Sequence, residues 1–290
     1  MSWRVVAITQ RCKLDYSMNY MVVRGEETKR ILLDEISVLV IENNAVSMTG
    51  CLLSMLCDKK IKVVLCDSKR NPQIDMVPLY GAHNDSKHIR EQILWREESK
   101  TAVWTAIIEE KIQNQSLLLA KIGKDNEAEM LRGYIEELSP GDPSNREGHA
   151  AKVYFNALFG MRFSRGDKNN IVNSALNYGY SLLLSVFNRE IIADGYLTQL
   201  GLGHDNQFNH FNLSCDLMEP FRVLVDEHVY QREYESFETE EKHKILDLLN
   251  KGIKIKKQEQ TVLNAIRIYT RSVLDAIEEN TPDRIVFFEL

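Results

Sequence analysis

The 290-residue sequence has few cysteines and lacks the motifs of common nucleotide-binding and hydrolase folds. Its five cysteines form no Cys-x-x-Cys pair and no zinc spacing, which excludes a zinc ribbon and favours free thiols in a reducing compartment. There is no phosphate loop, dinucleotide fingerprint or nucleophile elbow. No apolar run is long enough to span a membrane, and the N-terminus lacks a signal peptide's apolar core. We therefore expect a cytoplasmic protein that does not enter the membrane.

The sequence also lacks the excess of basic residues that nucleic-acid-binding proteins usually carry, because its formal net charge is -6. The charges are segregated, however. Residues 146–189 contain mostly arginine and lysine among their charged positions, whereas residues 226–241 are strongly acidic. A local basic face on an acidic protein is compatible with this pattern.

The hydrophobic residues, 44% of the chain, suffice for a substantial core and change their pattern along its length. Short runs rich in β-branched and aromatic residues predict strands at 3–9, 20–24, 29–33, 38–41 and 61–66. Apolar residues at helical spacing predict helices after Ser86, at 89–121, 127–138, 145–159, 170–194, 213–234, 242–249 and 258–279. We predict an α+β fold, with a small β-rich N-terminal domain over 1–70 and a larger all-helical catalytic domain over 88–290.

The segment 71–87, NPQIDMVPLYGAHNDSK, combines two prolines, a glycine and several turn formers. We predict a linker here. A lid or a DNA-contacting loop is the alternative, and a plain connector is favoured.

The stretch 201–222, GLGHDNQFNHFNLSCDLMEPFR, holds the densest set of chemically useful side chains. His204 follows a Gly-x-Gly, and Asp216 and Glu219 are three residues apart, so they share a face if the segment is helical. A third acid, Glu147, lies upstream in REGHAAKVYF. Carboxylates with one histidine form a hard, oxygen-rich ligand set that suits Mg²⁺ or Mn²⁺ rather than zinc.

Both acidic motifs have a structural interpretation as well. Residues 144–147, S-x-x-E, and 216–219, D-x-x-E, match capping boxes, in which the acids only satisfy free amides of a first helical turn. For either motif alone the cap is favoured over the metal site. A proline at position 220 agrees with a helix start.

The segments REGHAAKVYF, NSALNYGYSLL and GLGHDNQFNHFNLSCDLMEPFR together resemble the CRISPR-associated integrase, the universal first subunit of the spacer-acquisition machinery. The form DNQFNHFNLSCDLMEPFR is similar to the version that accompanies type II systems. The resemblance covers essentially the whole chain, including the order of β-rich part, linker and helical part.

The resemblance implies a metal-dependent DNA endonuclease and integrase, which joins 3′-hydroxyl ends of short foreign DNA to the CRISPR repeat by transesterification. It places the Mg²⁺ or Mn²⁺ ligands and catalytic residues on Glu147, His204 and Glu219, and gives Asp216 a supporting role. It also implies a homodimer formed through the β-rich domain, and a heterohexamer in which two dimers are bridged by a dimer of a small second subunit. Double-stranded DNA, both the spacer precursor and the repeat, is the implied substrate.

The DNA contacts are less defined, because the motifs do not fix them one by one. Four basic residues near the motifs are candidates: Arg146, Lys152, Arg165 and Arg222. Two other functions remain open at this point. One is a DNA-binding scaffold in which Glu147 and Glu219 are only caps, and the other is a metal-dependent nuclease that cuts but does not join.

Overall fold

The computed structural model describes residues 4–76 and 84–290, and its N-terminal part contains two four-stranded sheets. The first sheet has the order β1-β5-β7-β8, and its strands are β1 (Arg4–Ile8), β5 (Ile36–Ile41), β7 (Lys62–Cys66) and β8 (Pro72–Met76). The second has the order β4-β3-β2-β6, and its strands are β2 (Lys13–Ser17), β3 (Tyr20–Arg24), β4 (Thr28–Leu32) and β6 (Ser47–Met48). A short 3-10 turn, η1 (Leu33–Glu35), joins β4 to β5.

Burial explains the arrangement of the N-terminal sheets. Strand β5, ISVLVI, is buried at every position and pairs in parallel with both β1 and β7, as a two-sided apolar strand should. Helix α1 (Gly50–Asp58) begins where the Thr49 hydroxyl accepts a hydrogen bond from the Leu52 amide, and it buries Leu52 and Leu56 against the sheets. The β-rich N-terminal domain is therefore confirmed.

The predicted linker differs from the structure in its first part. Residues 72–76 form β8, which pairs antiparallel with β7 and so belongs to the first sheet. Pro72 is at the strand's first position, where a missing N–H is tolerated. Residues 77–83 of the predicted linker lie outside the described residues, and α2 (Asp85–Ile93) begins shortly after them.

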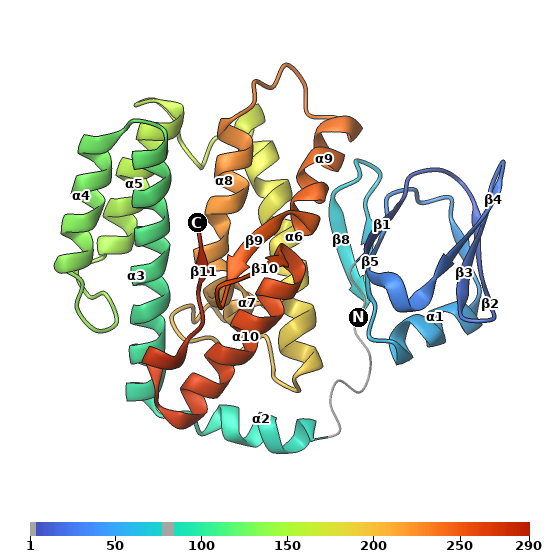
Figure 1. The fold of residues 1–290 in the computed structure, drawn as a ribbon, viewed down its shortest axis with the longest axis horizontal. Helices are drawn as coiled ribbons and strands as arrows, with labels where there is room; N and C mark the ends of the chain where they lie inside the picture. Colours follow the sequence, from blue (N-terminus) through green and yellow to red (C-terminus); the bar gives the residue numbers. More distant parts are fainter. Residues whose placement is uncertain (1–3, 77–83) are drawn as a thin grey trace.

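The C-terminal part is mostly helical, as expected. After α2 it contains α3 (Glu97–Lys121), α4 (Asp125–Glu136), α5 (Arg146–Phe159), α6 (Ile171–Ala193), α7 (Asn212–Met218), α8 (Arg222–Tyr230), α9 (Thr239–Leu246) and α10 (Val262–Glu279). Its 3-10 turns are η2 (Glu219–Phe221), η3 (Asp247–Asn250) and η4 (Pro282–Arg284). In Figure 1 the N-terminal sheets lie at one end of the molecule and α3, α4 and α5 at the other, with α6 between them.

The prediction of an all-helical C-terminal domain was wrong in one respect. A three-stranded antiparallel sheet forms from β9 (Gly252–Ile255), β10 (Gln258–Thr261) and β11 (Phe288–Glu289). Helix α10 consequently begins at Val262 rather than Gln258, where the Thr261 hydroxyl accepts a hydrogen bond from the Asn264 amide. Lys256 and Lys257, both at positive φ, form the turn between β9 and β10.

The two parts share an apolar core, to which the first sheet contributes Val38, Val40 and Val64, and polar groups also join them. Asp75 of β8 pairs with buried Lys62 at 2.6 Å and accepts a hydrogen bond of 2.8 Å from Ser185 of α6. Glu42, also buried, pairs with His243 of α9 at 3.0 Å. Because such bonds are directional, they specify one orientation of the helical part on the sheets.

Gly179, in the middle of α6, packs closely against α8 and α9. A Cβ at this position would collide with the Val225 side chain and press on Ile245. We expect Gly179→Ala to lower the free energy of unfolding by about 1–3 kcal/mol through overpacking. Urea denaturation measures this value.

Gly133 provides the matched control, because it lies in α4 with open space where a Cβ would be. Gly133→Ala should raise stability by roughly 0.5–1 kcal/mol, since alanine has the better helix propensity. Equal effects of the two substitutions would contradict the packing argument.

Candidate active site

Three helical segments bring charged groups to one point in the helical domain. The Lys111 ammonium, on α3, lies 2.5 Å from Oε1 of Glu147 on α5 and 2.5 Å from Oε2 of Glu219 in η2. Burial alone would lower the pKa of Lys111, but the charges of Glu219 and Glu147 outweigh it and raise that pKa. The lysine is therefore a cation shared by two carboxylates that are 72 residues apart in the chain.

Glu147 owes its position to the way α5 begins. The breaker SPGDP ends in a turn, and Asn145 adopts a left-handed conformation with φ of 55°. The Asp142 carboxylate then accepts hydrogen bonds from the amides of Arg146 and Glu147, at 2.7 and 2.9 Å. The predicted capping box 144–147 does not form, and the Glu147 side chain extends toward Lys111 instead.

Glu219 lies at a change of helix type. Helix α7 ends at Met218, η2 contains Pro220, and α8 continues from Arg222, so the run is helical with a 3-10 step at the proline. Asp216 lies inside α7, not at a helix start, so the second predicted capping box was wrong too. Neither acid is a cap, which removes the structural argument for the scaffold alternative.

The Glu219 carboxylate is buried and charged. Arg222 pairs with its Oε1 at 2.9 Å, and the guanidinium lies 4.6 Å from the centroid of the Tyr180 ring on α6. Burial raises the pKa of Glu219, but Arg222 and Lys111 together outweigh it and hold that pKa at about 2. The arrangement keeps Glu219 ionised and fixes its direction.

His204 is held by Asp216. The fully buried Asp216 carboxylate accepts hydrogen bonds from the amides of Leu202, Gly203 and His204, and its Oδ1 lies 2.6 Å from the His204 Nδ1. A Cβ on Gly203 would collide with the Trp104 ring, which explains the glycine at this position. Because Nδ1 donates to Asp216, Nε2 of the neutral imidazole keeps its lone pair.

The surroundings of His204 favour the protonated imidazole. The pKa of His204 is raised, first by its hydrogen bond to Asp216, against burial, and then by the charges of Asp216, Glu219 and Glu147. Carboxylates and an imidazole are ligand types that suit a divalent ion, but in the described part of the chain the ligand atoms of Glu147, Glu219 and His204 do not all lie within 4.8 Å of one another. Glu147, Glu219 and His204 would be its ligands. Asp216 would orient the imidazole, as carboxylates commonly do beside metal-bound histidines.

A comparison with known protein families shows the family to which the chain belongs. The family model for CRISPR associated protein Cas1 matches residues 5–254 of this chain. A CRISPR-associated endonuclease Cas1 from Neisseria meningitidis serogroup C (strain 8013) is 36% identical over 227 residues, which cover 78% of this chain and 74% of the relative. The chain belongs to the Cas1 family.

Other Cas1 relatives agree. A CRISPR-associated endonuclease from Francisella tularensis subsp. novicida (strain U112) is 26% identical over 263 residues, covering 83% of this chain and 81% of the relative. Among solved structures, a CAS1 protein from Thermotoga maritima has a TM-score of 0.75 at 17% identity, covering 94% of this chain and 97% of that one. A casposase bound to integration product has a TM-score of 0.76 at 17% identity, covering 97% and 91%.

A Cas6-RT-Cas1–Cas2 complex also matches, with a TM-score of 0.75 at 19% identity. The match covers 99% of this chain but only 36% of that one, so the chain spans about a third of that relative's length. At these identities the structures support the Cas1 fold alone.

The predicted DNA contacts of the Cas1-family chain differ in their surroundings. Lys152 is exposed on α5. Arg146 pairs with Glu137 at 2.8 Å, and Arg165 donates to Asn173 and Asn177 at 2.5 and 2.7 Å. Arg222 is bound to Glu219, as described above. Their contact with DNA remains a prediction.

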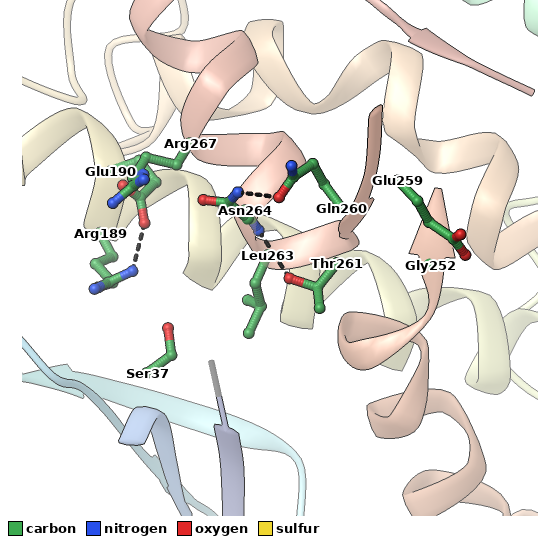
Figure 2. Close-up of a pocket in the computed structure, with 10 residues that line it drawn as sticks. All are labelled: Ser37, Arg189, Glu190, Gly252, Glu259, Gln260, Thr261, Leu263, Asn264 and Arg267. Atoms are coloured by element: carbon green, nitrogen blue, oxygen red, sulfur yellow. Dashed lines mark hydrogen bonds and ion pairs between the residues drawn. The ribbon is translucent and has the colours of Figure 1, made fainter. Parts of the chain in front are cut away.

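Other clefts lie away from these residues. Figure 2 shows a cavity of about 430 Å³ between the N-terminal sheets and α6 and α10, lined by Ser37, Arg189, Asn264 and Arg267 among others. No predicted site residue lines it. In the part of the chain that the structure describes, the metal-type ligand atoms that lie close together belong to His88, Glu91 and Glu278, and none of these is a predicted ligand. Among the described residues, no helix is long and apolar enough to cross a membrane.

Sequence reasoning missed Lys111 and Asp142. A signal for Lys111 exists, since it occupies the apolar face of α3 between Ile108 and Ile112 and near Trp104. A lysine on a buried helix face needs a partner of opposite charge. The sequence does not reveal which carboxylates supply it.

Asp216 supports the loop that carries His204, so its loss should destabilise the fold. We expect Asp216→Asn to lower the free energy of unfolding by about 2–4 kcal/mol, because an amide offers one acceptor oxygen to three backbone donors and a histidine. Asp205→Asn, at an exposed position of the same loop, should stay within about 0.5 kcal/mol of the parent. A loss at Asp205 as large as that at Asp216 would contradict the assignment.

Asp226 is buried on α8, four residues after Arg222, and accepts hydrogen bonds from Tyr154, at 3.0 Å, and from Tyr180. Burial raises the pKa of Asp226 to about 6, against the hydrogen bonds and the Arg222 charge, which lower it. An acid with a raised pKa in the folded state binds more protons there, so stability should decrease as the pH rises from about 4 to about 6. Asp226→Asn should remove this contribution.

Urea denaturation of parent and Asp226→Asn at several pH values tests this sign. The stability of the variant relative to the parent should increase over that pH interval and then level off. A constant difference would exclude the raised pKa of Asp226.

Proposed function

We propose that this Cas1-family chain is a divalent-ion-dependent DNA endonuclease and integrase that inserts short foreign DNA into a CRISPR array. The supporting observations are the convergence of Glu147 and Glu219 on one cation and the contact by which Asp216 orients His204. The family match and the curated relatives named endonucleases supply the reaction class. The casposase with a similar fold is described as bound to an integration product.

In this proposal Glu147, Glu219 and His204 hold Mg²⁺ or Mn²⁺. Such an ion stabilises negative charge on a phosphodiester while a 3′-hydroxyl displaces another 3′-oxygen. Other residues of the chain hold these ligands in position. Arg222 and Tyr180 fix the Glu219 carboxylate, and Asp216 fixes the imidazole so that Nε2 is available.

The proposed partners are double-stranded DNA, a second copy of the chain joined through the N-terminal domain, and a small second subunit that completes a heterohexamer. The support for the second subunit is the similarity to the Cas1 part of a complex described as Cas6-RT-Cas1–Cas2. Because this chain carries a net charge of -6, a partner that supplies basic surface would assist DNA binding.

The test is strand transfer of a labelled duplex with free 3′ ends into a supercoiled plasmid that carries the repeat, with the second subunit and Mn²⁺. Glu219→Gln should reduce joined product by at least about a hundredfold, because it removes a charged ligand at unchanged shape. EDTA should abolish joining. Glu129→Gln, on the exposed face of α4, should behave like the parent.

The other outcomes separate the alternatives. Cut but unjoined DNA, dependent on Mn²⁺ and on Glu219, would assign a hydrolytic nuclease. DNA binding without cutting or joining, equal in parent and Glu219→Gln, would assign a scaffold.

A further inference from the structure

Lys111 lies between the two proposed carboxylate ligands. Its ammonium contacts both proposed carboxylate ligands at 2.5 Å, and its side chain is 10% exposed. Arg222 supplies the second positive charge at Glu219, so two cations balance two buried or half-buried carboxylates. These two cations compensate the charges of the two carboxylates.

We propose that Lys111 is a built-in counter-ion of the active site, which holds Glu147 and Glu219 together and which a divalent ion must displace in order to bind. This inference rests on the proposed function, since it concerns the same ligands. A dication at the same carboxylates would lie within a few ångströms of the ammonium in a poorly hydrated site, where like charges repel strongly. The ion and the ammonium therefore compete, and they do not bind together.

The side chain is suited to this exchange. Lysine carries its charge on four flexible methylenes, so the ammonium can withdraw while the stem stays packed on the apolar face of α3. An arginine fork would bind the carboxylates more rigidly and exchange less readily. Lys111 thus stabilises the two carboxylates and lowers their affinity for the ion.

Lys121, at the end of the same helix, provides an internal comparison. Its ammonium pairs with Glu227 at 2.6 Å, but the side chain is 59% exposed and Glu227 is not a proposed ligand. Removing the Lys121 charge should leave ion binding unchanged, whereas removing the Lys111 charge should strengthen it.

The experiment measures Mn²⁺ binding by isothermal titration calorimetry without DNA, for the parent, Lys111→Met and Lys121→Met. Methionine keeps the length and apolar stem of lysine without the charge. We expect Lys111→Met to bind Mn²⁺ at least about tenfold more tightly than the parent, with a lower unfolding temperature in EDTA. Lys121→Met should match the parent in affinity. Glu219→Gln identifies the heat that comes from this site.

Unchanged or weaker Mn²⁺ binding by Lys111→Met, with Glu219-dependent binding in the parent, overturns the counter-ion role and leaves the proposed ligands standing. Absence of Glu219-dependent binding in the parent overturns both proposals.

A second measurement needs no variant and holds if Lys111→Met does not fold. The parent is acetylated with a lysine-specific reagent, with and without saturating Mg²⁺, and the modified peptides are quantified by mass spectrometry. Lys111 should be protected without Mg²⁺ and become several-fold more reactive with it, while Lys121 reacts equally in both states. Equal modification of Lys111 in both states overturns the proposal.

Discussion

The Glu219 carboxylate is a charge that the folded chain places almost out of reach of water, and the site depends on how that charge is compensated. Taking a carboxylate out of water costs several kcal/mol unless close partners compensate it. Lys111 arrives from α3 and Arg222 from the following turn, and Tyr180 of α6 covers the guanidinium. Each partner belongs to a different helix. The packing of these helices and the ionisation of Glu219 therefore support each other.

The sequence can reveal those site residues whose partners lie nearby in the chain. His204 and Asp216 are twelve residues apart, and their Gly-x-Gly-His loop and acidic helix are local features that can be read directly. Lys111 is different, because its partners lie 36 and 108 positions away and depend on how helices pack. The capping interpretations failed for a related reason. S-x-x-E and D-x-x-E match the spacing of a box, but Asp142 caps α5 and Asp216 lies within α7.

The strands also fall into those that the sequence predicts and those that it does not. Strands with β-branched residues on two buried faces, such as β5, were predicted from composition. Strand β8, PQIDM, and strand β10, QEQT, were not, since their sequences are polar and their positions at sheet edges need little apolar surface. The central strand β9, GIKI, was also missed, because four residues are too few to establish an alternating pattern. Pairing partners decide such strands, and a partner distant in sequence leaves no local pattern.

The polar contact between Asp75 and α6 has a mechanical consequence. Ser185, which binds Asp75, and Tyr180, which covers Arg222, are five residues apart on one helix, or roughly 8 Å along its axis. One short stretch of α6 therefore contacts both the N-terminal sheets, through Asp75, and the active site, through Arg222. The position of the Tyr180 ring over Arg222 thus depends on the same helix that the sheets hold.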